Sequence, residues 1–186
     1  MAYNKGMETA TKKNGIAIWA LRILLTLAFF ATLGFIFYNS LQTGEASAEQ
    51  SSKVVDTVQD AVAIVAPQSP IATAEGEDYE ALHALIRSMA HFAEFALLGA
   101  LGILCALSYT DKKPYVYFPL ICVFFVPIAD ECLQSFVAGR GTEFKDVCID
   151  IAGGMSGIIF ALGCVFVGLI LYRACVSLFS KRKRKE

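Results

Sequence analysis

The chain has 186 residues, of which 56% are hydrophobic and 18% are charged, and its formal net charge at pH 7 is -1. Its mean hydropathy of +0.55 comes from long apolar tracts of a kind that soluble domains rarely carry. The composition therefore excludes an ordinary soluble domain and favours an integral membrane protein.

Four apolar tracts are candidates for membrane-spanning helices, because a helix of about 20 mostly apolar residues crosses the hydrocarbon core of a bilayer. The apolar part of the third tract, which ends at Ala129, is too short to cross by itself, so its helix must continue through Asp130 and Gln134. We therefore predict an all-α integral membrane protein that is a bundle of four transmembrane helices. The predicted spans are residues 16–38, 88–109, 115–136 and 146–171.

The charges beside these spans predict their orientation. Four spans place both termini on one side, and that side, with Arg22 and the loop at 111–114, contains 12 of the 16 basic residues. Because Lys and Arg are enriched on the cytoplasmic side of a membrane, we expect both termini in the cytoplasm. Residues 1–15 are then a disordered cytoplasmic lead, residues 172–186 form a basic cytoplasmic tail, and residues 16–171 form the membrane domain.

The segment between the first two spans, residues 39–87, is predicted to lie on the extracytoplasmic side. Apolar residues recur there at helical spacing, at Val55, Val58 and Val62, with polar residues between them. We therefore predict an extracytoplasmic amphipathic helix that is too polar to span the membrane and that ends before Pro67. We interpret the segment as a solvated connector with one surface helix, and a lid over a binding site is the alternative.

Polar residues concentrate at the outer ends of the second, third and fourth spans. Arg87, His91 and Glu94 follow one another at steps of four and three residues, so they share one helical stripe. Ionisable groups inside a membrane are costly, which favours a functional role for this His and Glu over a structural one. Arg140 lies between two glycines, and their flexible backbone lets its guanidinium reach inward.

These ends are predicted to converge on one candidate ligand-binding site. The site consists of Arg87, His91, Glu94, Asp130, Gln134, Arg140, Asp146 and Asp150. With Glu131 included, five carboxylates face two arginines, so a dry site needs protons on some carboxylates, a metal or other cation, or an amine-bearing ligand. The chain carries no HExxH, Gly-x-Ser-x-Gly or paired metal motif. We therefore assign no catalytic residue, no metal ligand and no cofactor from the sequence.

Two further patterns concern helix packing and cysteine chemistry. Gly153 and Gly157 are one helical turn apart, and small residues at this spacing let a neighbouring helix approach closely. That approach would press Asp150 against the neighbour. The six cysteines show no CxxC spacing, and most are expected to pack as small apolar residues. A disulfide between Cys132 and Cys148 is left open, because both are predicted near the outer face.

At its polar residues the sequence resembles the VanZ-like family of bacterial membrane proteins. The similar segments are Tyr38 to Gln42, Ser47 to Ser52, Arg87 to Phe95, Asp130 to Phe136, Gly139-Arg140, Asp146, Asp150 and Gly153 to Gly157. Two positions depart from the family pattern: Phe95 stands where a tyrosine is common, and Asp150 where an asparagine is usual. The resemblance implies a multi-pass protein of the bacterial plasma membrane, in a family whose founding member is associated with resistance to teicoplanin.

The leading functional hypothesis is a non-enzymatic cell-envelope protein that binds an amphiphile at this extracytoplasmic site. Its partner would be a membrane lipid, a lipid-linked cell-wall intermediate or a lipidated glycopeptide antibiotic, with Arg87 and Arg140 placed for phosphate or carboxylate groups. A contribution to glycopeptide resistance is an expectation from the resemblance alone. The oligomeric state is left open.

Three other roles are weighed against this hypothesis. The first is a membrane enzyme that uses His91 and Glu94 with Asp130 or Asp146 on a lipid-linked substrate. Ion transport is disfavoured because the inner halves of the spans offer no charged relay. The third is a structural role, in which carboxylates and arginines pair to hold the bundle together.

The basic run at 181–185 has no interleaved aromatic residues, so we expect contact with anionic lipid and no nucleic-acid partner.

Overall fold

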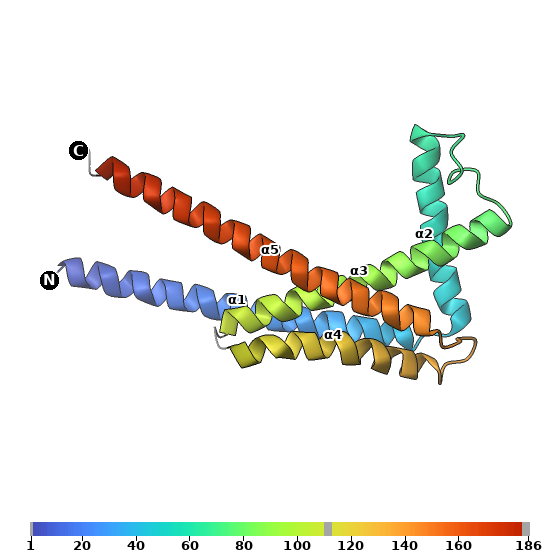
Figure 1. The fold of residues 1–186 in the computed structure, drawn as a ribbon, viewed down its shortest axis with the longest axis horizontal. Helices are drawn as coiled ribbons and strands as arrows, with labels where there is room; N and C mark the ends of the chain where they lie inside the picture. Colours follow the sequence, from blue (N-terminus) through green and yellow to red (C-terminus); the bar gives the residue numbers. More distant parts are fainter. Residues whose placement is uncertain (1, 110–112, 184–186) are drawn as a thin grey trace.

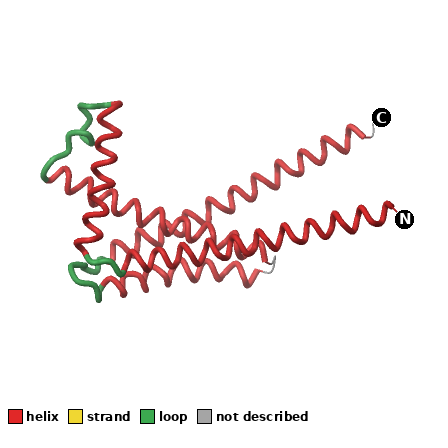
Figure 2. The backbone as a smooth tube through the Cα atoms, turned by 180° about the vertical axis from the view of Figure 1, so that it is seen from behind, coloured by secondary structure: helices red, strands yellow, loops and turns green. Residues whose placement is uncertain are grey.

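The computed structural model describes residues 2–109 and 113–183, and every regular element in these residues is an α-helix. The helices are α1 (Ala2–Ser40), α2 (Gly44–Val65), α3 (Glu77–Tyr109), α4 (Lys113–Gln134) and α5 (Phe144–Lys183). Figure 1 shows α1, α3, α4 and α5 bundled along the long axis, while α2 stands across them. The same arrangement is seen from behind in Figure 2, where both ends of the chain lie at the same end of the molecule.

Four helices are long and apolar enough to cross a membrane, which confirms the predicted number of spans. They cover Gly15–Ser40, Glu77–Tyr109, Tyr115–Gln134 and Phe144–Leu178. Large apolar side chains cover their outer surface, among them Phe30, Phe125 and Phe160, which are 61%, 66% and 72% exposed. Such a surface is stable in lipid and unstable in water. The chain is therefore a multi-pass membrane protein.

The helix ends differ from the predicted bounds at several places, and α3 begins at Glu77, before the predicted start of the second span at residue 88. The lead expected to be disordered is helical from Ala2, because adding turns to an existing helix costs far less than starting a new one. At the other end α5 continues past residue 171 to Lys183 for the same reason. The third span, in α4, ends at Gln134, two residues before its predicted end, where the chain enters a turn. In the predicted loop at 111–114, Asp111 and Lys112 lie outside the described residues.

The closest helix approach joins α3 to α5 and confirms the prediction made from the glycine spacing. A Cβ on Gly153 would collide with the backbone carbonyl of Phe92, and one on Gly157 would collide with that of Ala96. Gly99 of α3 meets Gly154 of α5 in the same way. Because no side chain separates the two backbones, Asp150 is held against α3 at the end of the bundle that carries the polar residues.

The apolar core lies between the four long helices in two groups of buried side chains. One group contains Phe29, Ile36, Phe95 and Leu98, and the other contains Ile103, Val123, Ile158 and Ala161. Phe95 is fully buried among apolar neighbours, so its ring fits there without a hydroxyl group that would need a hydrogen-bond partner. The core sets the spacing of the helices from which the polar residues project.

Helix α2 matches the predicted helix in position, and its location outside the membrane stays a prediction. The Thr43 side chain accepts a hydrogen bond of 3.3 Å from the Ala46 N–H and so caps its start. Val55 is fully buried against the rest of the protein, whereas Ile64 is 85% exposed. The Gln59 amide donates to two carbonyls of the following loop, at 3.1 and 3.0 Å. The loop thus folds back along α2.

Candidate functional site

The turn between α4 and α5 folds over the junction of α1 and α2. Gly139 has a φ of 75°, which favours glycine, and its backbone lies so close to Gly44 that a Cβ on Gly44 would collide with it. The Gly44 N–H also donates to the Ala138 carbonyl at 3.1 Å. This contact places Arg140 beside the last turn of α1, and all eight predicted site residues lie at this end of the bundle.

Asp130 is the most deeply buried carboxylate of the site, with no exposed surface. The Ser40 hydroxyl at the end of α1 donates a hydrogen bond to one of its oxygens. The Gln134 amide, one helical turn further along α4, donates to the other oxygen at 2.7 Å. Both oxygens are thus held in place by neutral donors, and neither is paired with an arginine.

Asn39 forms hydrogen bonds with both Glu94 and Arg140. The Asn39 side-chain amide donates to Glu94 Oε1 at 3.1 Å, and Arg140 Nη2 donates to the Asn39 carbonyl at 2.9 Å. Arg140 Nε and Nη1 are buried and have no hydrogen-bond partner in the described residues. Burial and, secondly, the nearby Arg87 lower the pKa of Arg140, yet a guanidinium stays charged in proteins.

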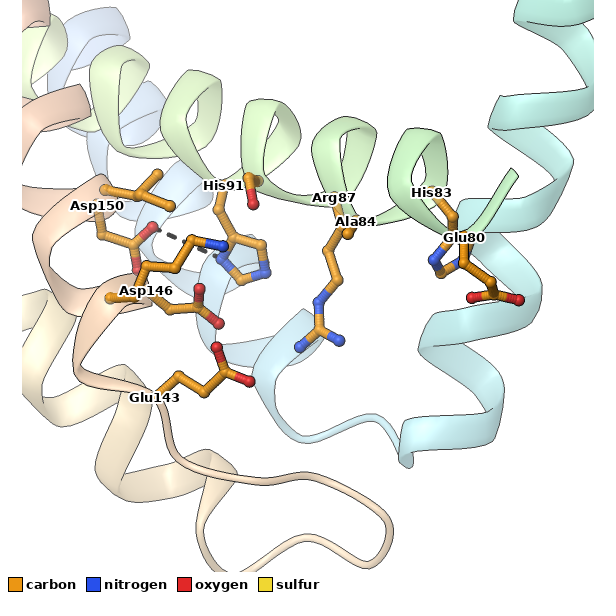
Figure 3. A pocket seen from close by; sticks show the side chains of 11 residues that line it. Glu80, His83, Ala84, Arg87, His91, Glu143, Asp146 and Asp150 are labelled. Atoms are coloured by element: carbon orange, nitrogen blue, oxygen red, sulfur yellow. Dashed lines mark ion pairs between the residues drawn. The ribbon is translucent and has the colours of Figure 1, made fainter. Parts of the chain in front are cut away.

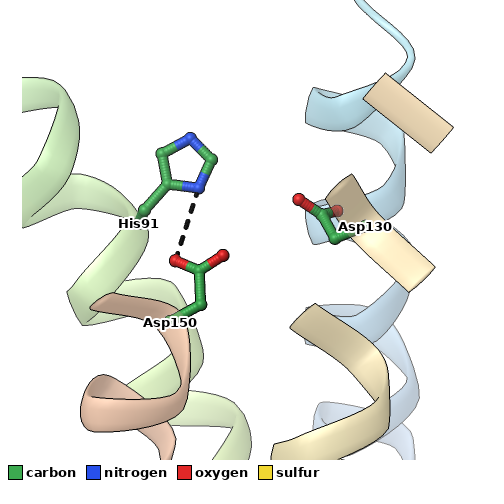
Figure 4. A group of neighbouring side chains, drawn as sticks. All are labelled: His91, Asp130 and Asp150. Atoms are coloured by element: carbon green, nitrogen blue, oxygen red, sulfur yellow. Dashed lines mark ion pairs between the residues drawn. The ribbon is translucent and has the colours of Figure 1, made fainter. Parts of the chain in front are cut away.

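His91 and Asp150 face each other across the contact between α3 and α5 (Figure 4). The His91 Nδ1 and Asp150 Oδ1 atoms are 3.7 Å apart, and their side chains are 18% and 3% exposed. Both atoms are buried without a hydrogen-bond partner among the described residues. At this distance they attract each other, but they do not form a hydrogen bond.

Two cavities flank this part of α3. A cavity of about 170 Å³ lies between α3 and the start of α5, and Figure 3 shows Arg87, His91, Asp146 and Asp150 around it. A second cavity, of about 220 Å³, lies between α1, α2 and α3 and is lined by Asn39, Glu94 and Arg140 among others. Arg87 and His91 line both cavities, so they stand on the wall between them.

The structure brings the carboxylates and arginines of the site together without pairing them. Within the parts of the chain that the structure describes, no arginine of the site forms an ion pair with a carboxylate; the two pairs found are Lys53–Glu49 and His91–Asp150. Glu131 instead accepts a hydrogen bond of 2.5 Å from the Glu143 N–H. The arrangement therefore disfavours the structural alternative, in which arginine–carboxylate pairs hold the bundle, and leaves guanidinium donors available.

Two residues of the site are absent from the predicted set. Asn39 and Ser40 stand at the end of α1, where the sequence indicates an exit into water, yet Ser40 is 1% exposed. Each reaches a residue on another helix, and no local pattern reports such a contact. The available signal is the similarity of Tyr38 to Gln42 to the VanZ-like segment. Cys132 and Cys148 are both exposed, and no disulfide joins them in this structure.

Comparison with known proteins agrees with this resemblance. A family model described as VanZ/LLP1 matches residues 23–171, a range that contains all eight site residues. No curated protein and no solved structure matches the chain. Since the matched range covers most of its length, the chain belongs to the VanZ/LLP1 family.

Proposed function

We propose that this membrane protein binds an anionic amphiphile at the extracytoplasmic end of its bundle, with Arg140 and Arg87 holding the negatively charged group. The amphiphile would be a lipid-linked cell-wall precursor or a lipidated glycopeptide antibiotic. The observation that carries the proposal is the state of Arg140, whose Nε and Nη1 atoms are buried and have no hydrogen-bond partner in the part of the chain that the structure describes.

The chemistry of Arg140 favours a phosphate or carboxylate as its partner. A buried charged donor without a partner is costly, because it has lost its water and gained nothing in exchange. The N–H groups of a guanidinium are strong donors to the oxygens of a phosphate or carboxylate. Nη2 of Arg140 already donates to Asn39, so the guanidinium is held in one orientation before a ligand arrives, and Nε and Nη1 are left to donate to that ligand.

The cavity beside Arg140 supports an amphiphile rather than a small ion. Its polar lining includes the cations Arg87 and Arg140 as well as Asn39 and the carboxylate Glu94, and its apolar lining includes Phe35, Val54 and Ile86. A ligand with a charged head and an apolar tail satisfies both kinds of wall, because each part meets groups of its own polarity. The excess of basic residues near both termini supports an outer-leaflet position for this end.

Native mass spectrometry of the protein, extracted in mild detergent, tests the proposal. We expect wild-type protein to retain one specific anionic lipid-linked mass, and Arg140→Gln to lose at least nine-tenths of it. Lys53→Gln is the matched control, because Lys53 is a cation on α2 whose side chain is 72% exposed and lies outside the cavity. Equal lipid retention by Arg140→Gln and wild type would remove Arg140 from the site.

The second candidate is a membrane enzyme that acts on a lipid-linked substrate. It is favoured by the pair of His91 and Asp150, which line the cavity between α3 and α5 with unpartnered atoms 3.7 Å apart. A histidine beside a carboxylate can act as a general base. Release of phosphate or headgroup from polyprenyl-linked substrates by wild type, and its loss in His91→Gln, would favour this candidate.

A further inference from the structure

We propose that His91, Asp130 and Asp150 form a binding site for one divalent first-row transition metal ion. The three residues come from α3, α4 and α5, and one nitrogen or oxygen atom of each lies within 4.8 Å of the other two. Figure 4 shows the three side chains directed at a common space between the helices. The inference goes beyond the proposed lipid binding, because it does not depend on Arg140 or Arg87 and is tested without any lipid.

The strongest support comes from atoms that lack partners. Asp150 is 2% exposed, and its Oδ1 atom accepts no hydrogen bond from the described residues. His91 Nδ1 is in the same condition, and the 3.7 Å between the two atoms is too long for a hydrogen bond. Unpartnered buried polar atoms are rare in proteins, and an ion bound between them is one of their recognised explanations. A cation placed between these two atoms would satisfy both.

Ligand chemistry and charge indicate the class of ion. One imidazole nitrogen with two carboxylate oxygens is a ligand set that suits Mn²⁺, Fe²⁺ and Zn²⁺ better than Ca²⁺, which prefers oxygen alone. A divalent ion also neutralises two carboxylates that no arginine pairs with in the described structure. Metal–ligand bonds of about 2.0–2.2 Å place ligand atoms about 3.0–3.5 Å apart. Small side-chain rotations therefore close the three residues around an ion.

The surroundings of the three residues resemble the outer shell of a metal site. Asp130 is oriented by the Ser40 hydroxyl and by the Gln134 amide, as the ligands of metal ions commonly are. The glycine contacts between α3 and α5 hold Asp150 on the same side as His91. Three protein ligands leave at least one coordination position for water, as in catalytic zinc sites.

The competing explanation is a plain ion pair, in which a small rotation brings His91 and Asp150 into a direct hydrogen bond. It requires no metal and predicts no dependence on Ser40 or Gln134. Metal binding measured on the purified protein therefore separates the two explanations.

Electron paramagnetic resonance of Mn²⁺ supplies the measurement, because the sharp signal of free Mn²⁺ is lost on binding. The full-length protein is purified through a histidine-free tag, stripped with EDTA and titrated with MnCl2, which avoids the cysteines because Mn²⁺ prefers nitrogen and oxygen to thiolate. We expect one Mn²⁺ per chain. Asp150→Asn and, independently, His91→Gln should weaken binding by more than about 100-fold, beyond the 10–100-fold loss that is typical when a hydrogen-bond partner of a metal ligand is changed.

Two controls make the result specific. Glu143→Gln removes a carboxylate that lines the cavity between α3 and α5 together with His91 and Asp150. Glu143 lies outside the proposed metal site, so this change should leave Mn²⁺ binding unchanged. Gln134→Leu removes a partner of Asp130 and should weaken binding by about 10–100-fold. Wild-type protein that binds no stoichiometric Mn²⁺ overturns the proposal in favour of the ion pair. Undiminished binding by folded Asp150→Asn and His91→Gln proteins overturns it as well.

Discussion

Arg140 Nη2 donates a hydrogen bond of 2.9 Å to the backbone carbonyl of Asn39, and so joins the turn before α5 to the end of α1. Nε and Nη1 of the same guanidinium are buried and receive no partner from residues 2–109 and 113–183. One part of Arg140 therefore positions the side chain within the fold, and the other part is available to a ligand. A substitution of Arg140 can therefore change both the fold near Asn39 and the binding of a ligand.

Arg140→Lys separates the charge of this residue from its shape. Lysine keeps the positive charge but has no planar fork for two oxygens, and it cannot both bond Asn39 and span an anion. We expect an affinity for the anionic amphiphile about ten-fold below wild type, equivalent to about 1.4 kcal/mol, with further loss in Arg140→Gln. Lipid retention across the three proteins measures this. Full affinity in Arg140→Lys would show that charge alone matters there.

The contact between Ser40 and Asp130 predicts a stability effect. Ser40→Ala removes a hydrogen bond to a fully buried carboxylate, and an unsatisfied buried group costs about 1–3 kcal/mol. Ser156→Ala is the control, since that exposed hydroxyl bonds only the Ala152 carbonyl of its own helix at 2.7 Å. Unfolding in detergent, followed by circular dichroism, should separate the two variants. Equal midpoints would mean that Asp130 gains little from Ser40.

The membrane spans and the shared helix face of Asp130 and Gln134 can be predicted from the sequence, whereas the hydrogen bonds between helices cannot. Each span is a continuous apolar tract, and residues four apart, such as Asp130 and Gln134, share one face of any helix. The local sequence is therefore sufficient to predict both features. The bonds of Ser40 to Asp130 and of Arg140 to Asn39 join residues far apart in the chain. They depend on how helices pack, which no spacing rule reports. The helical lead from Ala2 escapes prediction because it carries no apolar periodicity.

The packing of α5 on α3 predicts a contrast between two glycines of one helix. A Cβ at Gly157 would collide with the Ala96 carbonyl, whereas a Cβ at Gly163 would meet nothing within 4 Å. Gly157→Ala should lower stability by about 1–3 kcal/mol, as overpacking does. Gly163→Ala should leave it unchanged or raise it, because alanine favours helix. Thermal unfolding in detergent compares them, and equal stability would argue against the close contact.

The native cysteines test the predicted orientation of the protein in its membrane. Cys148 lies near the start of α5 and Cys175 near its end, and both are exposed. Two variants are needed, each with only one of these cysteines kept and the other five replaced by serine or alanine. If the termini are cytoplasmic, as the basic residues predict, a membrane-impermeant maleimide should label Cys148 in intact cells. It should label Cys175 only after permeabilisation, and the reverse pattern would place the polar site in the cytoplasm, where an outer-leaflet ligand could not reach Arg140.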